Sequence, residues 1–500
     1  MINFLKKNIA KIWAKNHVAK TEDFKNNAEV LQEKLLLDLV KKSEKTLFGL
    51  QHNFSEIKSV EDFQKNVKIS DYEDLKPFVE KVKHGDKNIL WPEKPEYFAK
   101  TSGTTSGTKY IPLTKEGMDY QVKAAQSALF HYIAQKNNAD FVNGKMIFLQ
   151  GSPELEDIND IKTGRLSGIV AHHIPKYLQK NRLPSYETNC IEDWETKVDK
   201  IVEETEKENM TLISGIPPWL IMYFEKLIER NGKKIKQLFP NLQLIVTGGV
   251  NYEPYREKME ELLGGKVDII QTFPASEGFF AFQDDYKKEG LLLQSNHGIF
   301  YEFIPLELYG KPDAPRLTLK EVELNKDYAL ILTTNSGLWA YSIGDVVRFI
   351  SKNPHRILVS GRTKHFTSAF GEHVIAFEVE EAMKATVEKF PAQITEFHLA
   401  PQVNPENGEL PYHEWFIEFE KEPENLEDFR QNLDAEMRKR NTYYDDLIAG
   451  NILQVLKITK LQKNAFQEYA KSEGKLGGQN KIPRLANDRK IGDFLKNFKI

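Results

Sequence analysis

A short run of hydroxyl side chains and glycines, TSGTTSGTK, occupies residues 101–109. Glycine lets the main chain approach a ligand closely, and serine and threonine add hydrogen-bond donors, so such a run suits a cluster of anionic oxygens. A Walker loop has Gly, four residues and then Gly-Lys-Ser/Thr. Here Thr108 separates Gly107 from Lys109, and Tyr110 stands where the metal-binding hydroxyl belongs. The run therefore predicts phosphate binding by another architecture, with a polar surface loop as the alternative.

Two acidic residues stand in turns further along the chain. Glu277 lies in TFPASEG, after an apolar run, where a carboxylate can hold Mg²⁺ beside a phosphate because hard cations prefer oxygen ligands. Asp345 ends YSIGD, where its carboxylate could accept both hydroxyls of a ribose. Arg362 and Lys364 follow in SGRTKHF. Each motif alone is a weak signal, because such turns and edge arginines are commonly only structural.

The bulk composition bounds the class of protein. The chain has 500 residues, 40% of them hydrophobic and 28% charged, which is typical of a globular protein of roughly two to four domains. A net charge of −4 gives no basic field, so we expect no nucleic-acid partner. No apolar stretch is long enough for a membrane span, so none is expected. Cys190 is the single cysteine, which fits a reducing compartment and predicts a cytoplasmic location.

Hydrophobic periodicity predicts the elements that position these motifs. The basic residues 1–20 are expected to form a helix on the protein's own body, with a membrane surface or a partner as the alternative, and residues 22–45 one long helix. The strip at 101–110 is expected to be the loop of a hairpin. From 145 to 280, apolar runs alternate with helical patterns, which predicts an α/β domain with largely parallel strands. The predicted strands are 145–151, 211–217, 242–249 and 267–273, and the predicted helices are near 192–208, 218–231 and 253–263.

The hydrophobic pattern of the sequence changes after this α/β part. Residues 291–361 contain short strand patterns joined by turns, which indicate an antiparallel sheet or barrel. The rest of the chain predicts a compact α+β unit. The predicted fold class is therefore α/β, with a large domain over 1–363 that combines parallel sheets and a β-barrel-like part. A small mobile α+β domain is expected over 364–500.

Five motifs follow one another in a fixed order. They are TSGTTSGTKYIPLT, FPASEGFFAFQ, YSIGDVVRF, FGEHV and GGQNKIPRL. This order resembles that of the adenylate-forming enzymes, and within them the plant auxin-responsive acyl-acid amido synthetase family and its bacterial relatives. An ordered set of five motifs is far more specific than any one of them.

The resemblance implies a site for ATP and Mg²⁺. Thr101, Ser102 and Thr104 would cradle the phosphates. Phe273 would pack on the adenine, and Glu277 would lie near the magnesium ion. The family pattern has tyrosine where this chain has Phe273, so stacking is kept and a hydrogen bond from the hydroxyl is lost.

The resemblance also implies roles for the second half of the chain. Asp345 would hold the ribose with help from Arg362, and Lys364 would lie at the hinge of the small domain. Lys481 matches the mobile lysine that steadies the transferring carboxylate, and Lys109 would add positive charge. With the predicted strand ends, the nucleotide-binding set is Thr101, Ser102, Thr104, Thr247, Gly248, Gly249, Thr272, Phe273, Pro274, Ala275, Ser276, Asp345 and Arg362; the catalytic set is Lys481, Glu277 and Lys109.

Three functions are then open. The first is an acyl-acid amido synthetase, which activates a carboxylic acid as acyl-AMP and transfers the acyl group to an amine, with an amino acid as the expected acceptor. The second is an acyl-CoA ligase that uses the same first step, and the third is a nucleotide-binding protein without catalysis. Residues 165–175 and 214–224 could line an acyl pocket by position, although His172 and His173 are expected to be structural.

Overall fold

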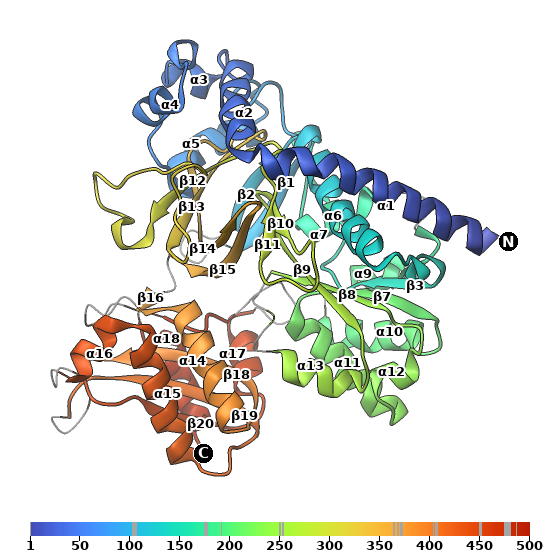
Figure 1. The fold of residues 1–500 in the computed structure, drawn as a ribbon, viewed down its shortest axis with the longest axis vertical. Coiled ribbons are helices and arrows are strands. Elements are labelled where there is room, and N and C mark those ends of the chain that lie inside the picture. The colour runs from blue at the N-terminus through green and yellow to red at the C-terminus, as the bar shows by residue number, and fades with distance from the viewer. Residues whose placement is uncertain are drawn as a thin grey trace. The chain divides into compact units, whose positions relative to one another are not determined.

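The chain forms two compact units in a computed structural model. The large unit contains Met1–Tyr252, Met259–Ile343 and Val347–Leu358, and the small unit contains Glu253–Lys258, Gly344–Val346 and Val359–Ile500. Figure 1 labels the elements of both units. The structure describes residues 2–102, 108–174, 179–191, 193–249, 252, 255–363, 366–367, 370, 374–403, 405, 409–449, 453–474, 482–486 and 488–500.

An eleven-stranded sheet dominates the large unit, in the order β12-β13-β14-β15-β11-β10-β9-β8-β7-β3-β6. Its parallel part is built from continuous apolar runs, as the sequence predicts, because helices cover such strands. This prediction is confirmed. The parallel strands are β6 (Arg182–Leu183), β3 (Lys145–Phe148), β7 (Met210–Ser214), β8 (Leu244–Gly248) and β9 (Asp268–Ala275), and the helices between them are α9 (Tyr186–Cys190), α10 (Trp194–Thr205), α11 (Pro217–Asn231), α12 (Ile235–Leu238) and α13 (Arg256–Leu263).

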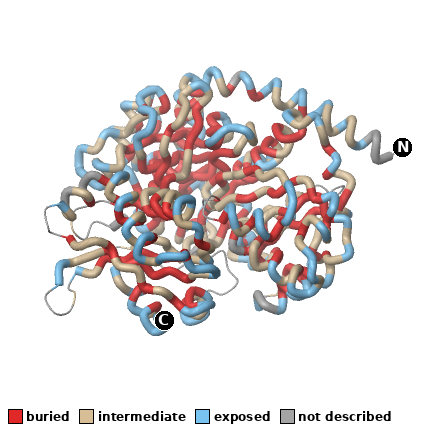
Figure 2. Tube along the Cα trace, turned by 60° about the horizontal axis from the view of Figure 1, so that its bottom comes forward, coloured by how far each residue is buried: buried red, intermediate tan, exposed pale blue. Residues whose placement is uncertain are grey.

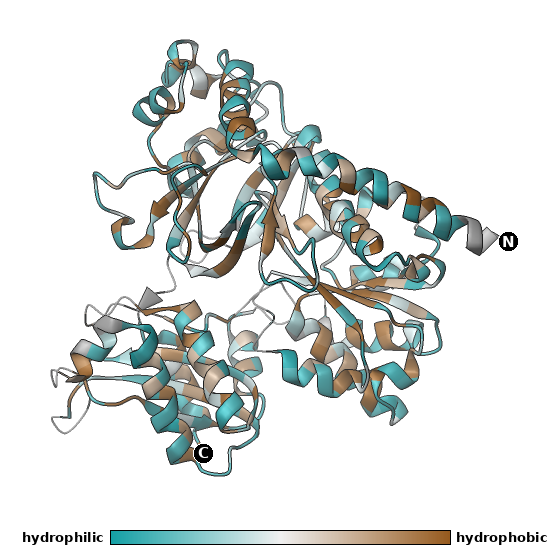
Figure 3. Ribbon diagram, viewed as in Figure 1, coloured by the Kyte–Doolittle hydropathy of each residue, from teal (hydrophilic) through white to brown (hydrophobic). Residues whose placement is uncertain are grey.

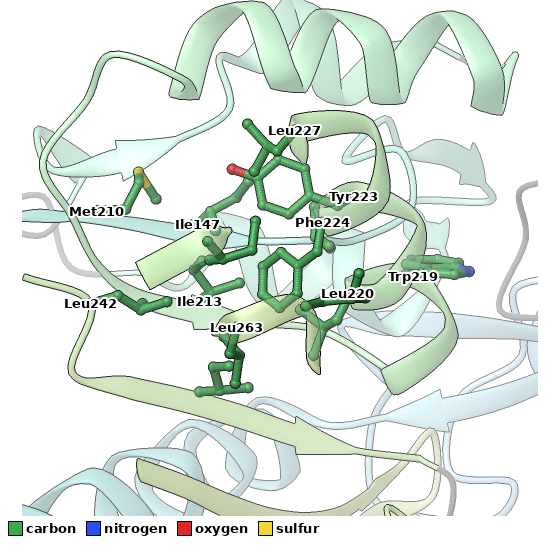
Figure 4. Close-up of a cluster of buried hydrophobic side chains, with 14 of the residues drawn as sticks. Ile147, Met210, Ile213, Trp219, Leu220, Tyr223, Phe224, Leu227, Leu242 and Leu263 are labelled. Atoms are coloured by element: carbon green, nitrogen blue, oxygen red, sulfur yellow. The ribbon is translucent and has the colours of Figure 1, made fainter. Parts of the chain in front are cut away.

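Helix α11 shows how these helices seal the sheet. Its apolar residues recur at helical spacing, so Leu220, Phe224 and Leu227 lie on one face and are fully buried. Figure 4 shows them gathered with Tyr223 over Ile147 of the sheet. Burial of each such side chain contributes about 1.5–3 kcal/mol. The strands themselves are largely buried, as Figure 2 shows in red.

The antiparallel strands continue the same sheet. Strand β11 pairs with β10 on one side and with β15 on the other, which joins the two halves of the sheet. The expected barrel-like part is therefore corrected: among the described residues these strands form one open sheet and no closed barrel is shown. Local patterns predict the strands but not which edge each one joins. The antiparallel strands are β10 (Gly278–Phe282), β11 (Leu291–Leu293), β12 (Ile299–Pro305), β13 (Asp327–Thr334), β14 (Tyr341–Lys352) and β15 (His355–Arg362).

A second, four-stranded sheet carries the hydroxyl-rich hairpin, in the order β2-β1-β5-β4. Its strands are β1 (Tyr97–Ser102), β2 (Thr108–Leu113), β4 (Glu156–Ile158) and β5 (Ile161–Gly164). The remaining helices of the large unit are α1 (Ile2–Asn26), α2 (Ala28–Lys42), α3 (Leu47–Gln51), η1 (Phe54–Glu56), α4 (Val60–Asn66), α5 (Tyr72–Lys83), α6 (Lys115–Lys136), η2 (Asp140–Asn143), α7 (Leu166–His172) and η4 (Leu306–Leu308).

The small unit has the expected α+β composition, with a three-stranded sheet in the order β18-β19-β20. Trp415 of β19 is fully buried and belongs to the same apolar core as Phe429 and Leu433 of α15. The strands are β16 (Phe366–Thr367), β17 (Val374–Ile375), β18 (Gln393–Gln402), β19 (Tyr412–Lys421) and β20 (Lys457–Leu461); the helices are α14 (Ala376–Lys389), α15 (Leu426–Arg440), α16 (Thr442–Ala449), α17 (Ala465–Ser472), α18 (Lys490–Leu495) and η6 (Lys496–Phe498).

The helix predicted over 22–45 is two helices instead. The chain leaves helical geometry at Asn27, where φ is −118° and ψ is 22°. The break has a tertiary cause, because the two helices pack on different elements. Helix α1 packs on α6, whereas Gln32 of α2 donates to the carbonyls of Ser295 and Ile299, at 2.7 and 2.8 Å. No helix in the described part of the chain is long and apolar enough to cross a membrane.

Buried polar groups join α1 to α6. His17 Nε2 lies 2.7 Å from the Ser127 hydroxyl. His131 Nδ1 donates to the Ser127 carbonyl at 2.9 Å, and its Nε2 lies 3.2 Å from the Thr21 hydroxyl. Burial lowers the pKa of His131 from 6.5 to about 4, so the ring is neutral in the folded protein at neutral pH. The expectation that the N-terminal segment is a helix on the protein's own body is confirmed.

We expect acid to destabilise the large unit through His131. Between pH 6.5 and about 4 the unfolded chain binds a proton at this residue and the folded chain does not, so stability falls as pH falls. The full loss is about 3 kcal/mol. Urea unfolding of the wild type and of His131→Gln at a series of pH values measures it, and the variant should show a shallower dependence. His84→Gln, at an exposed position, is the control; equal slopes for wild type and His131→Gln would contradict the assignment.

Candidate nucleotide-binding site

The carboxyl ends of β8 and β9 bring two of the predicted segments together. The strands pair in parallel with Gly248 opposite Thr272, and the Thr272 hydroxyl donates to the Thr247 carbonyl at 3.1 Å. A β-carbon at position 248 would lie 2.5 Å from the Thr272 carbonyl oxygen, so only glycine fits. At Gly249 φ is +77°, a conformation that glycine adopts readily. In open α/β sheets the edge at the carboxyl ends of the strands is where ligands bind.

The Thr247 hydroxyl is buried at this edge of the sheet. Thr247 is 2% exposed, and among the described residues its hydroxyl oxygen has no hydrogen-bond partner. A buried hydroxyl without a partner costs free energy unless a water or a ligand group completes its hydrogen bonding. The role of Thr247 in lining the nucleotide stays a prediction.

The TFPASEG motif folds as the end of β9 and a tight turn. Ala275 pairs with Gly278, so Ser276 and Glu277 form a two-residue loop between β9 and β10. Pro274 and these loop residues are half-buried. The expected turn is confirmed, and it places the Glu277 carboxylate beyond the strand that carries Thr272.

Phe273 lies deeper than an open stacking platform would. It is 6% exposed, and its ring contacts Phe280 edge-on, with 5.0 Å between the ring centroids and 73° between the planes. Its stacking on adenine stays a prediction.

Glu277 fits the magnesium role by its chemistry. Among the described residues no group of three or more His, Cys, Asp or Glu side chains could hold a metal. Magnesium in nucleotide sites usually takes one or two carboxylates and completes its octahedral shell with phosphate oxygens and waters. A single half-buried carboxylate therefore suits a magnesium ion that is bound together with ATP. The role of Glu277 as a magnesium ligand stays a prediction.

The two ends of the hydroxyl-rich strip lie on paired strands, as a hairpin requires, and residues 103–107 between them lie outside the described residues. Strands β1 and β2 pair antiparallel with Thr101 opposite Lys109 and Ser102 opposite Thr108. Helix α5 supports this hairpin, because the Tyr110 amide donates to the Tyr72 hydroxyl at 2.8 Å and the Lys109 ammonium lies 5.5 Å from the centre of the Tyr72 ring. Thr104 lies outside the described residues.

The small unit brings Asp345 and Arg362 to neighbouring positions. Gly344 has φ +84°, and its carbonyl accepts from the Thr363 amide at 2.8 Å. This bond joins the backbone beside Asp345 on β14 to the backbone beside Arg362, the last residue of β15. The adjacency is what shared binding of one ribose would need, although the roles of both residues stay predictions. Lys364 lies outside the described residues.

The segment after Lys481 is anchored to the small unit. Lys481 itself lies outside the described residues. Two residues later, the Pro483 carbonyl accepts from His398 Nδ1 at 2.6 Å, and the Arg484 carbonyl accepts from the Leu399 amide at 2.8 Å. Leu485 forms a parallel bridge with Leu399. The chain downstream of the predicted catalytic lysine is therefore fixed along β18.

Arg484 forms a buried cluster of contacts in the small unit that the motif did not predict. Its Nε lies 3.0 Å from a Glu396 oxygen, its Nη1 lies 3.2 Å from a Glu380 oxygen, and the side chain is 9% exposed. The guanidinium also lies 4.8 Å from the ring centres of Tyr255 and Phe397. Burial lowers the pKa of Arg484, but Tyr255 and the two carboxylates raise it more, so the net shift is upward. The only signal in the sequence is an arginine three positions after Lys481.

The two histidines of the expected acyl pocket make hydrogen bonds within the large unit. His172 Nε2 lies 2.8 Å from the Pro153 carbonyl, and His173 Nε2 lies 3.0 Å from the Tyr97 hydroxyl. Both contacts agree with the structural role expected for them.

The fold is that of the adenylate-forming enzymes. A 2-hydroxyisobutyryl-CoA ligase in its postadenylation state superposes with a TM-score of 0.62 at 12% identity, over 94% of this chain and 92% of the ligase chain. The GH3.15 acyl acid amido synthetase in complex with 2,4-DB superposes with a TM-score of 0.79 at 17% identity, over 97% and 96% of the two chains.

The sequence defines the family within this fold. The model of the GH3 family N-terminal domain matches residues 17–181 and 159–269, the central domain matches 292–362 and the C-terminal domain matches 377–490. The chain belongs to the GH3 family. A relative, the probable indole-3-acetic acid-amido synthetase GH3.1 of Arabidopsis thaliana, is 22% identical over 95% of this chain and 92% of its own length. The expected family resemblance is confirmed.

We expect Arg484→Met to destabilise the small unit strongly. The change leaves Glu380 and Glu396 partly buried without their cation, and loss of one partner of a buried pair typically costs about 3–5 kcal/mol. Arg438→Met removes the more exposed pair with Asp445 in the same unit and should cost less than about 1 kcal/mol. Urea unfolding of the full chain measures both variants. Equal losses would show that the Arg484 contacts contribute no more than a surface pair.

Proposed function

We propose that this protein is an ATP-dependent acyl-acid amido synthetase. The observation that carries the proposal is the match of the N-terminal, central and C-terminal GH3 domains in order along the chain. The named relative that spans 95% of the chain is an amido synthetase. A carboxylic acid and an amine, with an amino acid as the expected acceptor, are the proposed substrates. We keep the cytoplasm as the proposed location, because the chain has one cysteine.

In the first step a carboxylate oxygen attacks the α-phosphorus of ATP. The new oxygen–phosphorus bond gives acyl-AMP, and the bond from the α-phosphorus to the bridging oxygen breaks to release pyrophosphate. Because two anions meet, positive charge at the reacting phosphate is the main help that a protein can give. Lys109 on the hairpin and Lys481 are the proposed sources of this charge. Bound Mg²⁺, held by Glu277, would neutralise phosphate charge.

The other proposed residues bind and orient the nucleotide. The β1–β2 hairpin with Thr101, Ser102 and Thr104 would hold the phosphates. The edge formed by Thr247 and Thr272 would line the nucleotide. Asp345, beside Arg362, would accept the ribose hydroxyls.

In the second step the amine attacks the acyl carbonyl. A carbon–nitrogen bond forms, the carbon–oxygen bond to AMP breaks, and the amine loses a proton. A neutral amine is a competent nucleophile towards a mixed anhydride, so holding the two groups in line supplies much of the rate.

The products distinguish this proposal from its alternatives. Purified protein is incubated with ATP, Mg²⁺, a panel of carboxylic acids and either amino acids or coenzyme A, and the products are read by mass spectrometry. We expect an amide and AMP. A thioester in its place would identify an acyl-CoA ligase, and no AMP release with any acid would indicate a nucleotide-binding protein without catalysis.

Two variants should separate nucleotide binding from chemistry. We expect Asp345→Ala to weaken ATP binding by about tenfold or more, because loss of hydrogen bonds to a carboxylate costs about 1.5–3 kcal/mol. Lys481→Ala should leave ATP binding nearly unchanged and slow ATP–pyrophosphate exchange by about 100-fold or more. Calorimetry measures the binding, with Lys471→Ala as a control at an exposed lysine of α17. Normal exchange in Lys481→Ala would remove this residue from the mechanism.

A further inference from the structure

Helix α1 has one face that holds it on the large unit. Ala14 is fully buried, and Thr21 and Phe24 are nearly so. Lys7 forms an ion pair with Asp140, and His17 bonds to Ser127 of α6. Figure 1 shows α1 running beside α6 with the N-terminus at its outer end. These contacts attach the helix without using its opposite face.

A second side of α1 carries three exposed apolar side chains. Ile9 is 39% exposed, Ile12 58% and Trp13 56%. Residues three and four positions apart lie on one side of a helix, so these three side chains form a continuous outer stripe. Figure 3 shows apolar and polar segments alternating along this helix, and Figure 2 shows exposed stretches along it. Large apolar side chains exposed together mark an interaction surface more often than single ones do.

The charged residues of the first 21 positions, which include the stripe, are all positive. Residues 1–21 contain Lys6, Lys7, Lys11, Lys15 and Lys20 and no aspartate or glutamate, whereas the whole chain has a net charge of −4. Lys6, Lys15 and Lys20 are exposed. The partner that complements this face must therefore offer both an apolar layer and negative charge.

We propose that the outer stripe of α1 binds the surface of a bilayer that contains anionic phospholipids. Ile9, Ile12 and Trp13 enter the boundary between head groups and acyl chains, where tryptophan is favoured, and the exposed lysines meet the lipid phosphates. The inner face stays on α6, so the folded protein docks as it is. A second copy of the chain is a poorer fit, because packing stripe against stripe would bring rows of lysines together. The binding is peripheral and reversible, since three apolar side chains without a lipid anchor give only modest affinity.

Vesicle co-sedimentation of the full chain tests the proposal. We expect the protein to sediment with vesicles of equal parts phosphatidylcholine and phosphatidylglycerol, and to remain in solution with phosphatidylcholine alone. High salt should release it, because lysine–phosphate attraction is screened. No sedimentation with the anionic vesicles at low salt, or equal sedimentation with both kinds, would overturn the proposal.

Two sets of variants locate the binding surface. The first replaces Ile9, Ile12 and Trp13 by serine, and the second replaces Lys6, Lys15 and Lys20 by glutamine. Each set should weaken binding to anionic vesicles by about tenfold or more, since one lysine near such a surface contributes about 1 kcal/mol. The matched controls are Val30→Ser with Leu50→Ser, at apolar residues 70% and 66% exposed outside α1. Lys65→Gln, Lys68→Gln and Lys233→Gln, at exposed lysines, match the charge change.

Two further readouts keep the result unambiguous. Thermal unfolding should be unchanged in the stripe variants, because the inner face of α1 is untouched. The oligomeric state is measured by light scattering without lipid. Stripe variants that change the oligomeric state and leave vesicle binding intact would assign the surface to a second copy of the chain and refute the membrane proposal.

Discussion

The parallel pairing of β8 with β9 is the contact on which the predicted nucleotide site depends. It places Gly248 opposite Thr272, so close that a β-carbon at position 248 would clash with the Thr272 carbonyl oxygen. With this register β8 ends at Gly248 opposite Thr272, and β9 continues to Ala275 before the loop that carries Glu277. A slip of one residue would send every side chain of one strand to the other face. The buried Thr247 hydroxyl, the close backbone approach and the acidic loop therefore follow from one ladder of hydrogen bonds.

The sequence predicted most individual elements but not all of their connections. Continuous apolar runs bounded by Gly, Pro or Thr predicted β3, β7, β8 and β9, because a parallel strand that is buried on both faces is apolar along its length. The two errors have tertiary causes. Asn27 interrupts a helical pattern because α1 and α2 pack on different partners, and the expected barrel is part of an open sheet because the short β11 joins β10 to β15.

The candidate site shows the same division. The turn that carries Glu277 could be predicted because turn chemistry is local, whereas Asp345, which was also expected in a turn, lies within strand β14. The environment of Arg484 could not be predicted, because its partners Glu380, Glu396 and Tyr255 lie about 90 to 230 residues away from it in the sequence. The partnerless Thr247 hydroxyl was also beyond sequence reasoning, since burial without a partner is a property of packing.

The small unit is not one continuous stretch of chain. Besides residues from Val359 onwards it includes Glu253–Lys258 and Gly344–Val346, and the first of these supplies Tyr255 against Arg484. A gene fragment that began at residue 364 would encode neither insert. Arg484 would then lose the Tyr255 ring, and the side of its guanidinium that packs on this ring would be exposed to water. Modular swaps within this family therefore have to exchange three pieces together, and a recombination breakpoint placed at a single peptide bond would separate residues that fold as one body.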